Sequence, residues 1–538
     1  MVTVIKKLLL VIVCMAAMAL PAATVPHGAD RLRELVVFPE FNLGFKFGMT
    51  FQGTESVIQD NTPTEVAIER LRAGVKQQPD NTEQLMQLGV LLSQNDETNE
   101  AQACFEHVEQ LARKRTEANP QDGPALTLLG KSLWQLKRPE EAESAYRHAV
   151  LVSSNDWHCW IGLGNFLSNA KFSGMFPADL SPQSEASPEA MQQAILDYRP
   201  PAEALRAAET SLAEAGKYFD RAIALAPKKP EVLFQYAGYQ ATVGWENCFF
   251  RHCRDNEAID SNKILFFFLS QGTLTNLEKA AELDSKNYEL TALWAYFTWM
   301  QANEANKGTN AMAGNALPNK PRQSIRTAMT RLENLSGSPD KKVAAGALEN
   351  HGLLEMIFGN NAAAITDLRQ AVALDSTQES AWDLLLGFMH DSASPEELET
   401  ACVARVKING SARNRLLLTK VYTMEKKWNE AVKQAQIAGE METNSIIPPL
   451  FLAAIALKQS METNHLEEAG DQLRQAGNLL KVLPATKDRT DRWREFVLNV
   501  AIYNGLIGQP DIAKTWLNEV FKGFPNDETA EAISQALE

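Results

Sequence analysis

The chain has 538 residues, roughly the length of three to four compact domains or of one elongated array of repeats. Hydrophobic residues make up 45% and charged residues 22%, values that exclude bulk disorder and low-complexity sequence. The formal net charge is −15. Such an excess of negative charge repels phosphate backbones, so nucleic acid is not an expected partner.

The first 23 residues have the pattern of a cleavable signal peptide. Two lysines precede the apolar run 8–20, and two alanines close the segment. This run is shorter than the roughly twenty residues that a bilayer core requires. We therefore expect a secreted or periplasmic chain that reaches a membrane only through an uncleaved signal or through a partner. Cys14 follows a valine rather than a small residue, so a lipoprotein modified there is not expected.

An N-terminal arm at residues 24–62 contains a strand-like segment. From position 41 to position 52, large apolar residues alternate with polar residues or glycine. This period of two predicts a strand with one apolar face. The strand either covers the apolar edge of the first helices or is donated to a partner's sheet. In both cases its backbone amides need hydrogen-bond partners, because a lone strand has none on either side.

Past residue 63 the chain becomes helical and periodic. Gly130 is followed twelve residues later by Ala142, then by Tyr146 and Ala149 at separations of four and three. These separations place the last three on one helical face. Many copies begin 34 residues apart, as positions 67 and 101 do. The ladder recurs, in whole or in part, at Ala67, Ala101, Ala215, Gly352, Ala364, Ala469 and Ala513.

This pattern resembles the tetratricopeptide repeat, a pair of antiparallel helices. The resemblance implies an all-α fold, a right-handed superhelical solenoid of ten or eleven helix pairs. Small residues such as Gly130 let paired helices approach closely, while Leu129 and Tyr146 fill the seam. We expect N-terminal repeats at 63–168, central repeats at 169–340, and C-terminal repeats with a capping helix at 341–538.

The central repeats carry three insertions between the two helices of a pair. Gly164 and Ala215 are 51 residues apart, whereas an unbroken repeat would separate them by twelve. The second insertion holds six aromatic residues, among them Trp245, Phe249 and Phe250. Long aromatic loops are usually kept for function, so we expect a binding lobe. The alternative is that the aromatic side chains fold back over the helices that they interrupt.

The expected function is binding of a protein or peptide partner, without catalysis and without a cofactor. A carbohydrate-binding protein that uses the aromatic inserts is the alternative, and an enzyme with a site in those inserts is less favoured. No residue pattern nominates a catalytic group or a metal site, and the pairing of Cys248 with Cys253 stays open. By position in the family, the expected binding residues are Lys131, Trp134, Asn165, Asp383, His390, Arg413 and Lys420, with Trp245 from the insert.

Overall fold

The fold is known from a computed structural model that describes eleven segments of the chain. They are residues 29–39, 48–52, 55–59, 64–95, 97–176, 197–255, 257, 269–305, 317–460, 463–482 and 487–538. The predicted signal peptide, the first half of the alternating segment and Phe266–Phe268 lie outside them. Their assignments stay predictions.

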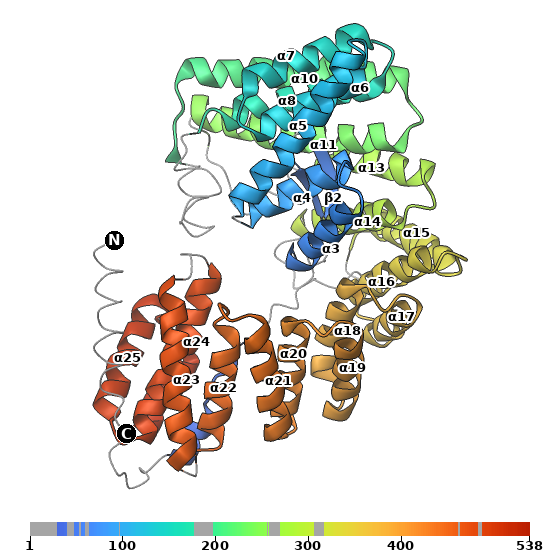
Figure 1. The fold of residues 1–538 in the computed structure, drawn as a ribbon. Coiled ribbons are helices and arrows are strands. Elements are labelled where there is room, and N and C mark those ends of the chain that lie inside the picture. The colour runs from blue at the N-terminus through green and yellow to red at the C-terminus, as the bar shows by residue number, and fades with distance from the viewer. Residues whose placement is uncertain are drawn as a thin grey trace. The chain divides into compact units, whose positions relative to one another are not determined.

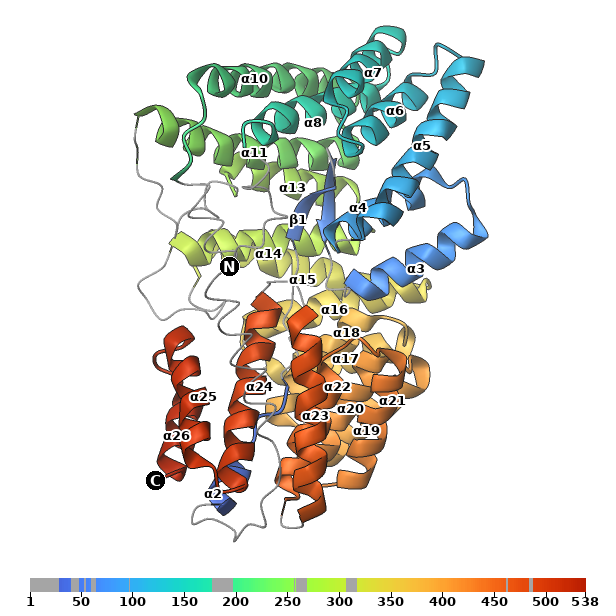
Figure 2. The same ribbon diagram turned by 60° about the vertical axis from the view of Figure 1, so that its left-hand side comes forward.

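The chain divides into two compact units. The N-terminal unit comprises Gly44–Pro182 and Gln193–Leu385, and the C-terminal unit comprises Met1–Leu43, Gln183–Gln192 and Leu386–Glu538. The boundary falls within helix α18 (Glu379–Ser392). Figures 1 and 2 show both units as layers of helices. Among the described residues, no helix is both long and apolar enough to cross a membrane.

The N-terminal unit begins with two strands and continues as helices. Its elements are β1 (Gly48–Gln52), β2 (Glu55–Gln59), α3 (Thr64–Gln77), α4 (Thr82–Gln94), α5 (Thr98–Ala118), α6 (Gly123–Gln135), α7 (Pro139–Val152), α8 (Trp157–Ser173), α10 (Ala202–Leu225), α11 (Pro230–Asp255), α13 (Gln271–Leu283), α14 (Tyr288–Ala305), α15 (Asn319–Ser336), α16 (Lys341–Ile357) and α17 (Asn361–Leu374). From α4 onward, consecutive helices pack as pairs. The predicted solenoid of helix pairs is therefore confirmed.

The pair α6 and α7 shows why the sequence folds in this way. Asp122 caps α6 by accepting a hydrogen bond from the backbone N–H of Ala125, which satisfies one of the free amides at the helix start. Ala142, Tyr146 and Ala149 are all 0% exposed. A side chain at Gly130 would place its Cβ 2.8 Å from the Tyr146 ring, so only glycine allows this approach. The predicted ladder is the seam between the two helices.

We call the first helix of each pair the A helix and the second the B helix. In the N-terminal unit the A helix α6 contacts α8, α8 contacts α11, and α14 contacts α16. Successive A helices thus share a surface, named here the A-helix face. Most B helices also pack on the following A helix, as α7 does on α8 and α15 does on α16. Each pair buries its apolar face only with its neighbours, as in other repeat arrays.

The strands form a hairpin rather than the lone strand expected. β1 pairs with β2 in antiparallel register, from Gly48 opposite Gln59 to Gln52 opposite Glu55. The second strand supplies partners for one edge of the first, which removes half of its unpaired amides. The hairpin contacts α11 and α14, so its main contacts are with the A-helix face of the central repeats instead of the first helices. Donation of the strand to a partner's sheet stays a prediction.

The C-terminal unit joins the last repeats to a segment from the start of the chain. Its remaining elements are α2 (Ala29–Glu34), α19 (Pro395–Ile408), α20 (Ala412–Met424), α21 (Trp428–Met441), α22 (Ile447–Lys458), α23 (Thr463–Val482), α24 (Lys487–Leu506), α25 (Pro510–Gly523) and α26 (Glu528–Ala536). α20 packs with α21, α22 with α23, and α24 with α25. The A helices α20, α22 and α24 contact one another in series, and α26 continues the series after α24.

Candidate functional site

Four of the predicted binding residues lie on successive A helices of the N-terminal unit. Lys131 and Trp134 lie on α6, Asn165 on α8 and Trp245 on α11. Because α6 contacts α8 and α8 contacts α11, the structure places them along one row of helices. Asp383 belongs to the same unit and lies on α18.

Asn165 links two A helices. Its Nδ2 donates a hydrogen bond to Oε1 of Gln235 on α11 at 3.0 Å. Its Oδ1 has no hydrogen-bond partner among the described residues. A buried oxygen without a hydrogen-bond partner lowers the stability of a fold by roughly 1–3 kcal/mol, so Asn165 is a destabilising position. The Asn165 side chain is buried, so it offers no surface to a partner in this structure.

The aromatic residues of this row are partly exposed. The Trp134 ring meets the Phe166 ring edge-on, with centroids 5.4 Å apart and planes at 89°. The ring centroids of Trp245 and Phe249 are 6.4 Å apart. Lys131, Trp134 and Trp245 each keep part of their surface in contact with solvent. These three residues are the accessible members of the predicted set in the N-terminal unit.

The other predicted residues belong to the last repeats. Arg413 and Lys420 lie on the A helix α20, seven residues apart and therefore on one side of it, and both are partly exposed. His390 lies on α18, and its side chain is outside the described part of the chain. Asp383 is 3% exposed and thus contributes little surface. The eight predicted residues are divided between the two units.

Sequence reasoning missed a docked segment in the C-terminal unit. Residues 29–39, named here the strap, form α2 and a short extended stretch. α2 contacts α22, α24 and α26, which are the last three A helices of this unit (Figure 2). Ala29, Leu32 and Val36 are buried in the same apolar cluster as α22 and α24. The strap therefore occupies the A-helix face of the last repeats.

The buried positions of the strap follow the spacing of a helix held in a groove. Ala29, Leu32 and Arg33 share one side of α2, and Val36, two residues after the helix ends, is buried in the same apolar cluster as Ala29 and Leu32. Arg33 is 8% exposed. Its Nε donates to the Ser460 hydroxyl at 3.1 Å, and its Nη2 donates to the Ser460 carbonyl at 3.2 Å. A buried guanidinium is thus satisfied by the chain just after α22.

Beyond α2 the groove binds the backbone of the strap. Asn499 on α24 accepts a hydrogen bond from the N–H of Val37 at 3.0 Å and donates one to its carbonyl at 2.7 Å. Lys458 Nζ donates to the carbonyl of Glu34 at 2.9 Å, where the helix ends. Phe38 then meets Phe451, with ring centroids 6.0 Å apart. An amide side chain that pairs with both backbone groups of one residue replaces the bonds of a neighbouring strand.

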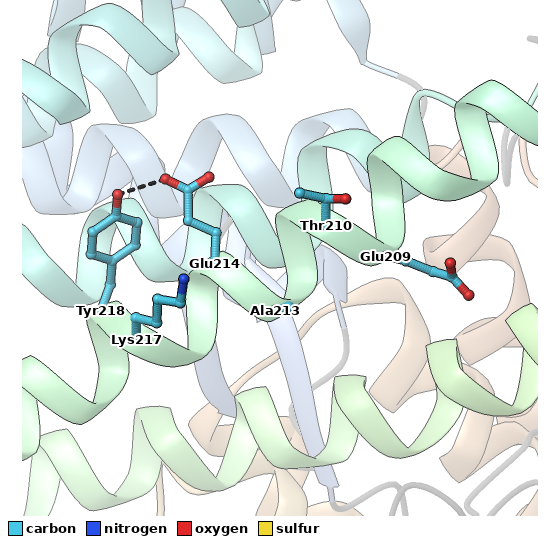
Figure 3. Close-up of a pocket in the computed structure, with 6 residues that line it drawn as sticks. All are labelled: Glu209, Thr210, Ala213, Glu214, Lys217 and Tyr218. Atoms are coloured by element: carbon cyan, nitrogen blue, oxygen red, sulfur yellow. Dashed lines mark hydrogen bonds between the residues drawn. The ribbon is translucent and has the colours of Figure 1, made fainter.

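Three pockets lie along α7, α8 and α10, away from the predicted residues. The largest, of about 600 Å³, is lined by α10 alone (Figure 3), and the others have volumes of about 330 and 260 Å³. In Figure 3, Tyr218 and Glu214 point toward one another from one side of α10. Both are contacted by Arg147 of α7, whose Nη1 lies 3.1 Å from Glu214 Oε1 and 3.2 Å from Tyr218 Oη.

The charges in these pockets neutralise one another. The hydrogen bond from Arg147 lowers the pKa of Glu214, whereas burial raises the pKa of Tyr218. Arg147 also bonds Glu143 on its own helix at 2.9 Å. Glu214 therefore stays ionised and paired, and Tyr218 stays protonated. This network joins α7 to α10 as a structural contact and offers no activated acid, base or nucleophile.

The first part of the predicted aromatic insertion is helical up to Asp255, so the prediction of a loop is wrong for these residues. Trp245, Phe249 and Phe250 lie on α11, which runs for 26 residues. Phe249 is 0% and Phe250 1% exposed, and both pack edge-on against Phe172 of α8. The alternative prediction was that the aromatic side chains fold back over the helices, and it holds for Phe249 and Phe250. Buried rings cannot stack on sugars, so the carbohydrate-binding hypothesis loses them as a binding surface.

Cys248 and Cys253 are both free thiols on α11. Five residues of helix place their side chains on different sides, so these two cysteines do not form a disulfide with each other. Burial raises the pKa of each thiol, which leaves both protonated. Within the described ranges, no group of three or more histidine, cysteine, aspartate or glutamate side chains could hold a metal ion.

Comparison with known proteins identifies one repeat and several similar folds. Residues 123–156 match the family model of the tetratricopeptide repeat, a segment that spans α6, α7 and the turn after them. No curated protein matches the chain. Among solved structures, yeast Tom70 is 16% identical, covers 88% of this chain and 91% of its own, and has a TM-score of 0.34.

Two bacterial structures are similar over about half of the chain. The C-terminal part of a repeat-containing protein from Cytophaga hutchinsonii is 12% identical over 51% of this chain and 99% of that one, with a TM-score of 0.35. Pseudomonas aeruginosa PilF is 14% identical over 46% of this chain and 90% of its own, with a TM-score of 0.27. Superpositions this loose do not transfer a binding site.

Proposed function

We propose that this tetratricopeptide-repeat chain is a non-catalytic scaffold of the cell envelope that binds a protein or peptide partner on its A-helix faces. The observation that carries the proposal is the strap. A segment of eleven residues is held on the A-helix face of the C-terminal unit through Asn499, Ser460 and an apolar groove. A surface that holds a peptide segment of its own chain has the shape and the hydrogen-bonding groups to hold another.

The proposed location in the cell envelope is supported by the amino-acid sequence. The charged and apolar pattern of the first 23 residues supports export, and the net charge of −15 disfavours nucleic acid as a partner. In the N-terminal unit, the accessible residues of the predicted set are Lys131, Trp134 and Trp245. Tryptophan is among the residue types enriched at binding hot spots.

Site-specific photocrosslinking tests the proposed face. A photoreactive phenylalanine analogue replaces Trp134 on the A helix α6, or Leu151 on the B helix α7, which is 79% exposed. We expect discrete covalent adducts from the native envelope with the probe at position 134 and none with the probe at position 151. Adducts of equal yield at both positions, or at position 151 alone, would contradict binding on the A-helix face.

A further inference from the structure

The strap makes contacts that another chain could reproduce. Its helix buries side chains at three positions, and the residues after the helix add the buried Val36, backbone hydrogen bonds at Val37 and the Phe38 ring. Backbone hydrogen bonds are the same for most sequences, so the pair formed by Asn499 and Val37 does not depend on the identity of residue 37. Recognition of sequence therefore rests on the buried side chains of the strap, mainly on Leu32, Arg33 and Val36.

Features of the strap and of the groove favour reversible docking. Asn499 and Ser460 are polar, and water satisfies both side chains when the strap leaves. α2 has only six residues, and a helix of that length is not stable alone in water. The strap is therefore held by the groove rather than by its own helical preference. Burial of Leu32 and Val36 supplies the main hydrophobic free energy that holds the strap. A competing segment with apolar side chains at these two positions would gain the same free energy.

We propose that the groove formed by α22, α24 and α26 is a recognition site for an amphipathic peptide segment, and that the strap is its displaceable resident. The partner has a small residue, leucine, arginine and a branched apolar residue at positions i, i+3, i+4 and i+7, followed by an extended apolar stretch. This inference rests on the proposed function, because it names the partner class for one of the two A-helix faces. An external segment binds by replacing the strap.

The test uses the full chain with a weakened strap. The probe is a fluorescein-labelled synthetic peptide with the sequence of residues 28–39, GADRLRELVVFP. The weakened protein carries Leu32→Glu and Val36→Glu, which place carboxylates at buried positions. The matched control carries Arg31→Glu, which places a carboxylate at an exposed position of the same helix. Fluorescence polarisation measures the affinity of the probe for each protein.

We expect the weakened protein to bind the probe at least tenfold more tightly than the wild type and the Arg31→Glu control do. Replacing the arginine at position 33 of the probe by alanine, or adding Asn499→Ala to the weakened protein, should reduce affinity about tenfold or more. A folded weakened protein that does not bind the probe would overturn the proposal. Concentration-dependent dimers of the wild type that disappear in the weakened protein would also overturn it, because a second copy's strap would then be the occupant.

Hydrogen exchange of the wild type keeps the test decisive if the weakened protein fails to fold. Strap amides that exchange faster than the core of α24 support a displaceable segment, whereas equal rates show that the strap is an inseparable part of the unit. The crosslinking probe at position 134 lies in the other unit. Adducts there, without binding of the labelled peptide, would remove this inference and leave the proposed function intact.

Discussion

Replacing Tyr146 by alanine should lower the free energy of unfolding by about 3–5 kcal/mol, the usual cost of deleting a fully buried aromatic ring. Tyr146 is 0% exposed and lies between Gly130 and Gly162. Its ring also packs on Phe166, with centroids 5.2 Å apart. The cavity would open the seams of two consecutive pairs at once. Urea unfolding followed by circular dichroism measures the change.

Two further variants separate loss of the ring from a general sensitivity of this region. Gly130→Ala adds a Cβ 2.8 Å from the ring, and we expect it to cost about 1–3 kcal/mol because the buried ring cannot move away. The control Tyr218→Ala removes a partly exposed tyrosine of α10 and should cost less than half as much as Tyr146→Ala. A loss below about 1 kcal/mol for Tyr146→Ala would contradict the packing described for this seam.

Glu246→Gln should stabilise the protein by an amount that grows with pH. Glu246 lies on α11, is 1% exposed, and has an Oε2 without a hydrogen-bond partner among the described residues. Burial raises its pKa well above the usual carboxyl range. Between the unfolded pKa and the raised folded pKa, the folded state binds a proton that the unfolded state has released. The stability of the wild type therefore falls as pH rises through this window.

Thermal unfolding from pH 4 to pH 8 measures this effect. At pH 4 the carboxyl is largely protonated in both states, so the variant and the wild type should differ little. At pH 8 we expect the variant to unfold at a higher temperature, because glutamine carries no charge to desolvate. The control Glu231→Gln changes an exposed carboxylate of the same helix and should show no such trend. A constant difference across the whole range would show that Glu246 does not titrate in this way.

Local sequence pattern was sufficient to predict the helix pairs. The spacing of Gly130, Ala142 and Tyr146 reports contacts between helices that follow each other directly, so it can be recognised within one repeat. Prolines at 79, 227 and 525 follow the ends of α3, α10 and α25 by two residues. These signals involve residues that are close in the sequence. The contacts that they predict are also local, because they join helices that follow one another along the chain.

The aromatic insertion was predicted to begin too early, because a repeat of standard length was imposed on a helix that continues to Asp255. Between Pro230 and Asp255 no proline interrupts the chain, and apolar or aromatic residues at 239, 243 and 250 continue one helical face. This spacing was available in the sequence. The second strand also had a signal, a Gly-Thr dipeptide at 53–54 between two short runs.

The strap could not have been predicted from the sequence in the same way. Its apolar residues indicate only that it packs against something, and no local pattern pairs Arg33 with Ser460. The same limit applies to Asn499, which stands among the buried apolar residues of α24. Of the predicted binding residues, Lys131, Trp134, Arg413 and Lys420 are partly exposed on A helices, as is Trp245, which was expected in the insertion. Their role stays a prediction.

The docking of the strap has a consequence for the order of events during synthesis. Arg33 and Ser460 are 427 positions apart, so the ribosome completes almost the whole chain before the groove exists. At 5–20 residues per second, this interval lasts about 20–85 seconds. The repeats between them can fold as they emerge, since each needs only its neighbours. The first described segment of the chain is thus among the last to dock. Translation speed therefore sets how long the apolar side chain of Leu32 stays exposed to solvent.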